Sequence, residues 1–133
     1  MMRIEFPGLF DLQVNGFAGV DFNRPGVSTA ELDHAAEAMR RTGVTRFLPT
    51  LITAPLDAFS SCARTLARWK HPGAVGIHAE GPYISPTEAR GAHPPAHIIP
   101  ASVEDFRRRQ DASEGRIVLV TVAPGRTSYG SGP

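Results

Sequence analysis

The stretch Phe10-Asp-Leu-Gln-Val-Asn15 decides which fold this chain can adopt, because apolar and polar residues alternate along it without a break. A period of two is typical of a β-strand, and it puts Asp11, Gln13 and Asn15 on one face. Strands of a parallel sheet are normally buried on both faces and read as continuous apolar runs. This strand instead turns three polar groups to one side, which predicts that this side faces a functional surface.

The residues outward from this strand alternate between helix and strand patterns. Ser28 and Glu31 form a capping box that opens a helix, and this helix is expected to end at Gly43. Further helices are expected over residues 56–69 and from Ser102, and further strands over residues 44–51, 74–79 and 116–122. The second strand is expected to be interrupted at Pro49. The resulting order β-α-β-α-β-α-β predicts parallel strands joined by right-handed crossovers.

Two folds accommodate this order: an open doubly wound sheet and part of a TIM (β/α)8 barrel. The first strand-to-helix turn carries no G-x-G-x-x-G sequence, so nothing supports a dinucleotide-binding sheet. Polar strand ends at the C-terminal mouth of a barrel form its catalytic floor, which favours the barrel. The chain has 133 residues, whereas a complete barrel takes about 250. We therefore predict an α/β fold, a partial TIM barrel of about four parallel strands with intervening helices, as a single incomplete domain over residues 1–133.

The composition excludes several classes of protein. Fourteen Lys and Arg against thirteen Asp and Glu give a net charge of +1, so neither nucleic acid nor an acidic membrane is an expected partner. The longest basic run, Arg107-Arg-Arg109, is expected to form a solvated helix face. The single cysteine, Cys62, excludes an internal disulfide and fits a reducing compartment. The N-terminus has no apolar signal segment, and we expect a cytoplasmic protein.

Two motifs near the predicted third strand carry groups that can do chemistry. His78 and Glu80 are two residues apart, so they lie on one face at the C-terminal end of that strand. An imidazole beside a carboxylate suits metal ligation or acid–base work, although an isolated H-x-E pair is more often a strand-end His and a surface Glu. His93 lies in a loop stiffened by prolines, where it is either a substrate contact or a polar residue of an ordered turn.

Four sequence blocks occur together and in a fixed order. They are Pro7-Gly-Leu-Phe-Asp-Leu-Gln-Val-Asn-Gly16, Phe47-Leu-Pro-Thr-Leu-Ile-Thr53, Gly76-Ile-His-Ala-Glu-Gly-Pro-Tyr-Ile-Ser-Pro86 and Gly91-Ala-His-Pro94. As a set they resemble the N-terminal part of the N-acetylglucosamine-6-phosphate deacetylases, a family of the amidohydrolase superfamily. Val120-Thr-Val-Ala-Pro124 resembles the fourth strand of that family, so the family-like region runs over about residues 6–124.

The resemblance implies a TIM-barrel hydrolase that removes acetate from an N-acetylated amino-sugar phosphate, with one divalent metal, zinc, per site. Such a metal lowers the pKa of a bound water to about 7 and polarises the amide carbonyl. By position, Glu80 corresponds to the metal-binding carboxylate, and Ala92 and His93 correspond to the substrate-contacting pair. Gln13 and Asn15 fall where many amidohydrolases carry the H-x-H pair of a second metal. Amides do not replace imidazoles as strong zinc ligands, so the resemblance is to the single-metal branch.

The remaining expectations concern residues beside or beyond this site. His78 is expected to shape the site beside Glu80 without being a ligand. The family's two further metal-binding histidines and its catalytic aspartate lie beyond the fourth strand, so no catalytic residue is expected in this chain. Residues 125–133 depart from the family pattern as an atypical tail. We therefore expect a truncated member whose open sheet edges favour a homo-oligomer.

Three alternatives stay open. A non-catalytic remnant, or a self-associating half-barrel without hydrolase activity, has the same architecture and releases no acetate. A different branch of the amidohydrolases fits less well, because those enzymes usually carry D-x-H-x-H where this chain has Asp11-x-Gln13-x-Asn15. A flavodoxin-like binding module is the alternative at the level of the fold.

Overall fold

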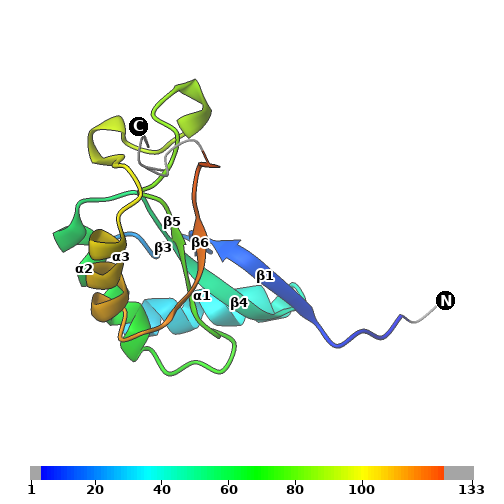
Figure 1. The fold of residues 1–133 in the computed structure, drawn as a ribbon. Helices are drawn as coiled ribbons and strands as arrows, with labels where there is room; N and C mark the ends of the chain where they lie inside the picture. Colours follow the sequence, from blue (N-terminus) through cyan, green and yellow to red (C-terminus); the bar gives the residue numbers. More distant parts are fainter. Residues whose placement is uncertain (1–3, 125–133) are drawn as a thin grey trace, which may run out of the picture.

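A computed structural model describes residues 4–124, which are organised around one four-stranded parallel sheet (Figure 1). The strands are β1 (Leu9–Val14), β4 (Val44–Ile52), β5 (Ile77–Glu80) and β6 (Ile117–Thr121), and the helices between them are α1 (Thr29–Arg41), α2 (Leu56–Arg68) and α3 (Val103–Ala112). The order across the sheet is β1-β4-β5-β6, and each neighbouring pair is parallel. This confirms the α/β prediction. The tail expected over residues 125–133 lies outside the described residues.

Helix α1 shows how local sequence sets the boundaries of an element. The side chain of Ser28 accepts a hydrogen bond from the backbone N–H of Glu31, and the Glu31 carboxylate accepts one from the backbone N–H of Ser28. The predicted capping box is therefore confirmed, and such caps stabilise a helix by about 1 kcal/mol. The buried stripe of the helix comprises Leu32, Ala35, Ala36 and Met39. Gly43 follows with a φ of 98°, which ends the helix without the strain that a Cβ would bring.

The main core lies between the helices and one face of the sheet. Its largest buried side chains include Phe22, Phe47, Leu51 and Phe59. Trp69, directly after α2, packs on the same side, with its ring centroid 5.8 Å from that of Phe47. Strand alternation sends the intervening side chains to the opposite face, which is turned away from the helices (Figure 1). Packing and chemistry therefore occupy opposite faces of the sheet.

The apolar side chains of β1 are only partly covered. Val14 is buried, but Phe10 and Leu12 remain 44% and 52% exposed, and Phe10 lies opposite Arg46, whose guanidinium is 5.3 Å from the centre of its ring. β1 is an edge strand, and α1 packs over the neighbouring strand β4 rather than over the outer margin of β1. The exposed apolar side chains therefore follow from the open edge.

The expected interruption at Pro49 is wrong, because β4 runs without a break from Val44 to Ile52. Proline has no N–H to donate to a neighbouring strand. The pairing of β1 with β4 accordingly shifts register between Asp11 and Val14, and Val14 lies opposite Pro49. At this point the N–H of Val14 donates to the hydroxyl of Thr50 at 3.1 Å. A side chain of β4 thus contributes to the pairing where the register shifts.

The expectation of a wholly solvated Arg107–Arg109 face is also wrong, because Arg109 is only 3% exposed. Its Nε donates to Asp105 Oδ2 at 2.7 Å, one helical turn earlier. Its guanidinium lies over the ring of Phe59 on α2, 4.8 Å from the centroid. Arg109 therefore belongs to the contact between α2 and α3, since a run of three residues on a helix spans more than one face.

The loops contain short elements that the sequence patterns do not predict. After β1, the strands β2 (Gly16–Phe17) and β3 (Val20–Asp21) form an antiparallel hairpin. Its turn residues Ala18 and Gly19 have φ values of 50° and 82°, the pattern of a two-residue hairpin turn. The loop after β5 contains two 3-10 turns, Glu88–Arg90 and Pro95–His97. None of the helices within residues 4–124 has the length and apolar character needed to cross a lipid bilayer.

Candidate functional site

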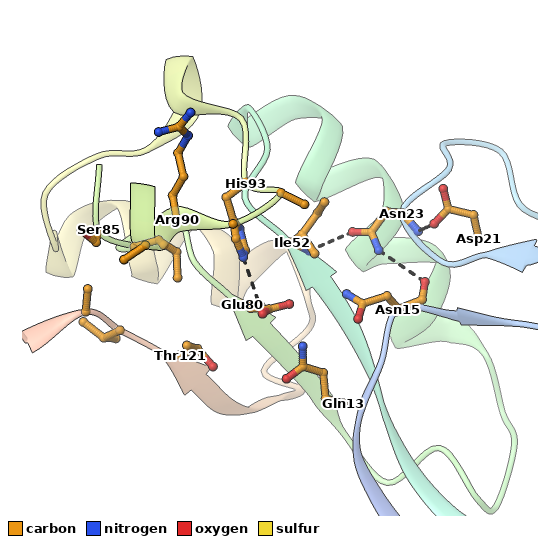
Figure 2. Close-up of a pocket in the computed structure, with 16 residues that line it drawn as sticks. Gln13, Asn15, Asp21, Asn23, Ile52, Glu80, Ser85, Arg90, His93 and Thr121 are labelled. Carbon is orange, nitrogen blue, oxygen red and sulfur yellow. Dashed lines mark hydrogen bonds and ion pairs between the residues drawn. The ribbon is translucent and has the colours of Figure 1, made fainter. Parts of the chain in front are cut away.

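A cavity of about 770 Å³ opens at the carboxyl ends of the parallel strands. Each strand of the sheet contributes a lining residue at or near its end: Gln13 of β1, Ile52 of β4, Glu80 of β5 and Thr121 of β6. The loops after β1 and β5 supply further lining residues, among them Asn15, Asp21, Asn23, Ser85, Ala92 and His93 (Figure 2). The carboxyl ends of parallel strands are where α/β proteins bind ligands. The cavity is therefore the candidate site.

The structure brings most of the residues singled out in the sequence to this one cavity. Gln13, Asn15, Glu80, Ala92 and His93 all line it. Gln13 and Asn15 lie two residues apart at the end of β1, and Glu80 ends β5. Asp11, expected on the same face, lies opposite the buried Phe47 and does not line the cavity. Their roles as a metal ligand or as substrate contacts stay predictions.

Glu80 and His93 form the polar centre of the cavity. Nε2 of His93 lies 3.5 Å from Oε1 of Glu80, and the two side chains are 12% and 18% exposed. On the other side of the ring, Nδ1 lies 2.9 Å from Oγ1 of Thr53. Figure 2 shows His93 reaching from its loop towards Glu80 at the end of β5, with Gln13 on the far side of the carboxylate. A carboxylate and an imidazole in contact can bind a polar ligand or exchange a proton.

Asn23 ties together the strand ends on one side of the cavity, and the sequence patterns did not single it out. Its Oδ1 accepts a hydrogen bond from the N–H of Ile52 at 2.8 Å, and its Nδ2 donates to the carbonyl of Thr50 at 3.0 Å. Its own N–H donates to Asp21 Oδ1 at 2.8 Å (Figure 2). The sequence signal is the spacing Asp21-Phe-Asn23, which suits an Asx turn. The target of the Asn23 side chain lies on another strand and cannot be deduced from that spacing.

His78 lies outside the lining of the cavity, buried at 2% exposure. Its Nε2 is 2.8 Å from Oγ1 of Thr121, and its Nδ1 is 3.3 Å from Oγ1 of Thr50. Burial lowers the pKa of His78, and the nearby charge of Glu80 partly opposes this shift. That His78 shapes the site stays a prediction. In the structure its buried imidazole links β4 and β6, the two neighbours of β5.

The loop that carries His93 is anchored at its start by Tyr83. The Tyr83 hydroxyl donates to Asp105 Oδ2 at 2.9 Å, and Asp105 in turn accepts from Arg109. Burial and the neighbouring carboxylate raise the pKa of Tyr83, so the phenol stays protonated as a donor. The carbonyl of Tyr83 accepts from the N–H of Ala123 at 2.8 Å. These contacts fix the loop to α3 and to the end of β6.

The described residues do not complete a metal site. Within residues 4–124, no three His, Cys, Asp or Glu side chains converge in a way that could hold a metal ion. Glu80 is a single carboxylate whose other polar neighbours in the cavity include the amides of Gln13 and Asn15. A catalytic zinc normally takes three protein ligands, and amides are poor substitutes for imidazole or thiolate. Glu80 can therefore serve only as one ligand of a larger set.

In comparisons with known proteins, this chain is similar to deacetylases of amino-sugar phosphates. No protein-family model matches the chain. Its sequence is 35% identical to the N-acetylglucosamine-6-phosphate deacetylase of Bos taurus, over 89% of this chain and 30% of the bovine protein. It is 37% identical to the N-acetylgalactosamine-6-phosphate deacetylase of Shewanella sp. (strain ANA-3), over 88% of this chain and 30% of that protein.

A solved structure supports the same relationship. This structure is a mutant of the N-acetyl-D-glucosamine-6-phosphate deacetylase from Mycobacterium smegmatis in complex with N-acetyl-D-glucosamine-6-phosphate. It is 31% identical to this chain and matches it with a TM-score of 0.82, over 92% of this chain and 32% of the mycobacterial one. The chain thus spans about a third of the length of the relatives it matches. The match also confirms that the four parallel strands correspond to part of a deacetylase barrel. The chain is therefore homologous to the N-terminal part of the N-acetylglucosamine-6-phosphate deacetylases and matches that part of their barrel.

Proposed function

We propose that this chain contributes to the hydrolysis of the N-acetyl amide of an amino-sugar 6-phosphate, with release of acetate. The observation that carries the proposal is the contact between Glu80 and His93 in a cavity at the carboxyl ends of the strands. The cavity volume of about 770 Å³ lies within the range of small-molecule sites. Relatives named for the N-acetylglucosamine and N-acetylgalactosamine phosphates support this substrate class without choosing between the two sugars.

In this proposal, each lining residue has a role that its chemistry permits. Glu80 supplies one carboxylate ligand to a single divalent metal, zinc, whose other ligands come from outside residues 4–124. When bound, such an ion polarises a carbonyl and activates water. Ala92 and His93 contact the sugar or its amide, and His93 can give or take a hydrogen bond through the ring nitrogen that faces the cavity. Gln13 lines the cavity beside Glu80 as a neutral hydrogen-bonding group.

A second candidate is a non-catalytic, self-associating half-barrel, and the two edge strands favour it. Leu12 on β1 is 52% exposed and Val118 on β6 is 63% exposed. Unpaired strand edges that carry apolar side chains promote association. A homo-oligomer is compatible with both candidates, whereas only the first predicts release of acetate.

We further propose that the protein is cytoplasmic. Its single cysteine, Cys62, is a buried free thiol, which fits a reducing compartment.

The first prediction tests the two candidates directly. The full chain, loaded with zinc, is assayed for acetate release from N-acetylglucosamine 6-phosphate beside Glu80→Gln and Glu88→Gln. Glu88 is exposed and does not line the cavity, so Glu88→Gln controls for the loss of one negative charge. We expect Glu80→Gln to lose at least about 100-fold in rate, because an amide is a far weaker metal ligand than a carboxylate. Glu88→Gln should match the parent chain.

Absence of acetate release from folded, zinc-loaded parent chain would contradict the hydrolase proposal. If sedimentation then showed oligomers, the second candidate would be favoured. Equal activity of Glu80→Gln and Glu88→Gln would show that Glu80 has no part in the reaction.

A further inference from the structure

Thr53 makes a contact with the site that the proposed function does not use. It directly follows β4, is 2% exposed, and places Oγ1 2.9 Å from Nδ1 of His93, 40 residues later in the chain. Among residues 4–124, His93 is the hydrogen-bond partner that the structure gives to the Thr53 side chain. A buried hydroxyl with a single partner keeps pointing towards that partner, because leaving the hydroxyl without a hydrogen bond would cost about 1–3 kcal/mol.

The chain directly after Glu80 is shaped around this hydroxyl. Gly81 has a φ of +94°, and a Cβ at that position would lie 2.2 Å from Oγ1 of Thr53. A distance that short is a steric clash, so any side chain at position 81 would displace the hydroxyl. The glycine therefore keeps the space that the contact between Thr53 and His93 requires.

The two neighbours of the His93 ring together determine which nitrogen carries the proton. Oε1 of Glu80 lies 3.5 Å from Nε2, and an ionised carboxylate only accepts hydrogen bonds. A favourable contact with Glu80 therefore needs the hydrogen on Nε2. In the neutral ring Nδ1 then carries a lone pair, and the Thr53 hydroxyl, which can donate or accept, is left to donate to it.

We propose that Thr53 is a positioning residue whose hydroxyl donates to Nδ1 of His93 and fixes the tautomer that presents an N–H into the cavity. Two neighbours on opposite sides of the ring, from the ends of β4 and β5, hold its orientation, although His93 itself lies in a loop. An N–H in this position is a donor for a ligand oxygen, such as an amide carbonyl or a sugar hydroxyl. The assignment of the tautomer stands on geometry alone, and only its use on a substrate rests on the proposed function.

The test compares Thr53→Val, which removes the hydroxyl at nearly constant volume, with Thr53→Ser, which keeps it. Thr65→Val removes a hydroxyl on α2, away from the cavity lining, and serves as the matched control. The ring nitrogens of His93 are observed by 15N NMR on the full chain, at a pH well above the ordinary imidazole pKa of about 6.5. We expect no proton on Nδ1 in the parent chain. The Nδ1 resonance should move in Thr53→Val, and stay in place in Thr53→Ser and Thr65→Val.

A proton on Nδ1 in the parent chain, or an Nδ1 resonance that does not respond to Thr53→Val, would overturn the proposal. Where acetate release is measurable, kcat for Thr53→Val should fall about tenfold, as for the loss of other groups that orient a functional side chain, and Thr53→Ser should restore most of it. The NMR result does not depend on activity, so a chain that releases no acetate but shows the expected ring signals would refute the hydrolase function and support the positioning role.

Discussion

At the scale of single residues, threonine hydroxyl groups provide hydrogen-bond partners for the buried polar groups near the cavity. Thr50 accepts from the N–H of Val14 and lies within hydrogen-bond distance of His78, whose other nitrogen meets Thr121. These threonines come from β4 and β6, on either side of the strand that carries His78. The sequence places His78 and Glu80 on one face, but the partners of the imidazole depend on the register of three strands. That register is set by packing, which local patterns do not describe.

The buried His78 predicts a loss of stability at mildly acidic pH. Burial lowers the pKa of this side chain in the folded state, so the unfolded chain binds a proton more readily. Neutral His78 makes its full contribution to the free energy of unfolding above the ordinary imidazole pKa of about 6.5. This contribution is lost as the pH falls from there through the lowered pKa of His78 in the folded state. Urea unfolding at a series of pH values between about 7.5 and 5 measures this loss. His78→Gln should flatten the dependence relative to the parent chain.

The control is His34→Gln, since His34 is exposed on α1. It should leave the pH dependence of the unfolding free energy unchanged. If His78→Gln kept the slope of the parent chain, another group would be responsible for the acid sensitivity.

At the scale of elements, α3 acts as the anchor of the loop that carries His93. Asp105 accepts from both Tyr83, near the start of that loop, and Arg109, one turn later on the helix. Arg109 also reaches the carbonyl of Ala54 after β4, with Nη1 at 3.4 Å. One helix thus connects the segments that follow two neighbouring strands.

We expect Asp105→Ala to destabilise the fold by about 3 kcal/mol, because it leaves the buried guanidinium of Arg109 without its carboxylate. Chemical denaturation monitored by fluorescence or circular dichroism measures the change. Glu104→Ala is the matched control, since the ion pair between Glu104 and Arg108 is exposed and should contribute less than about 1 kcal/mol. Equal effects of the two substitutions would show that the contact network of Asp105 is dispensable.

The elements themselves could be predicted well because each has a local cause. The capping box at Ser28 depends on neighbours in sequence and appears as expected. The alternation expected along β1 holds only in part, because the pairing with β4 shifts register between Asp11 and Val14, and Asp11 does not line the cavity with Gln13 and Asn15. The sequence patterns do not predict the continuous strand at Pro49 or the burial of Arg109, because the first depends on the pairing of β4 with β1 and the second on Phe59 of α2. The same reason explains why the roles of Asn23 and Thr53 at the site stayed hidden, since their decisive contacts lie 27 and 40 residues away.

At the scale of the whole molecule, the sheet has two open edges. The strand order leaves β1 and β6 unpaired on their outer sides within residues 4–124, and both carry exposed apolar side chains. On β1, Phe10 and Leu12 are exposed, and Val14 is the residue of this strand that belongs to the described core. Such surfaces associate with other apolar surfaces in water.

We expect the chain to self-associate, and Leu12→Lys to weaken this association at least about fivefold, because a charge on an edge strand opposes pairing and apolar contact. Sedimentation velocity over a range of concentrations measures the effect. Val75→Lys is the control, because Val75 is 42% exposed but precedes the inner strand β5. A monomeric parent chain, or equal weakening by both lysines, would contradict the role of the β1 edge.

The contacts that hold His93 have a consequence for the order in which the site takes shape. Thr53, Glu80, and the anchor of Tyr83 on Asp105 all lie between residues 53 and 105. Chains emerge from the ribosome N-terminal end first, and early segments can fold before later ones are made. The contacts that hold the imidazole of His93 can therefore form during synthesis, once residue 105 has left the ribosome. The orientation of His93 thus depends on one continuous segment of the chain, residues 53–105.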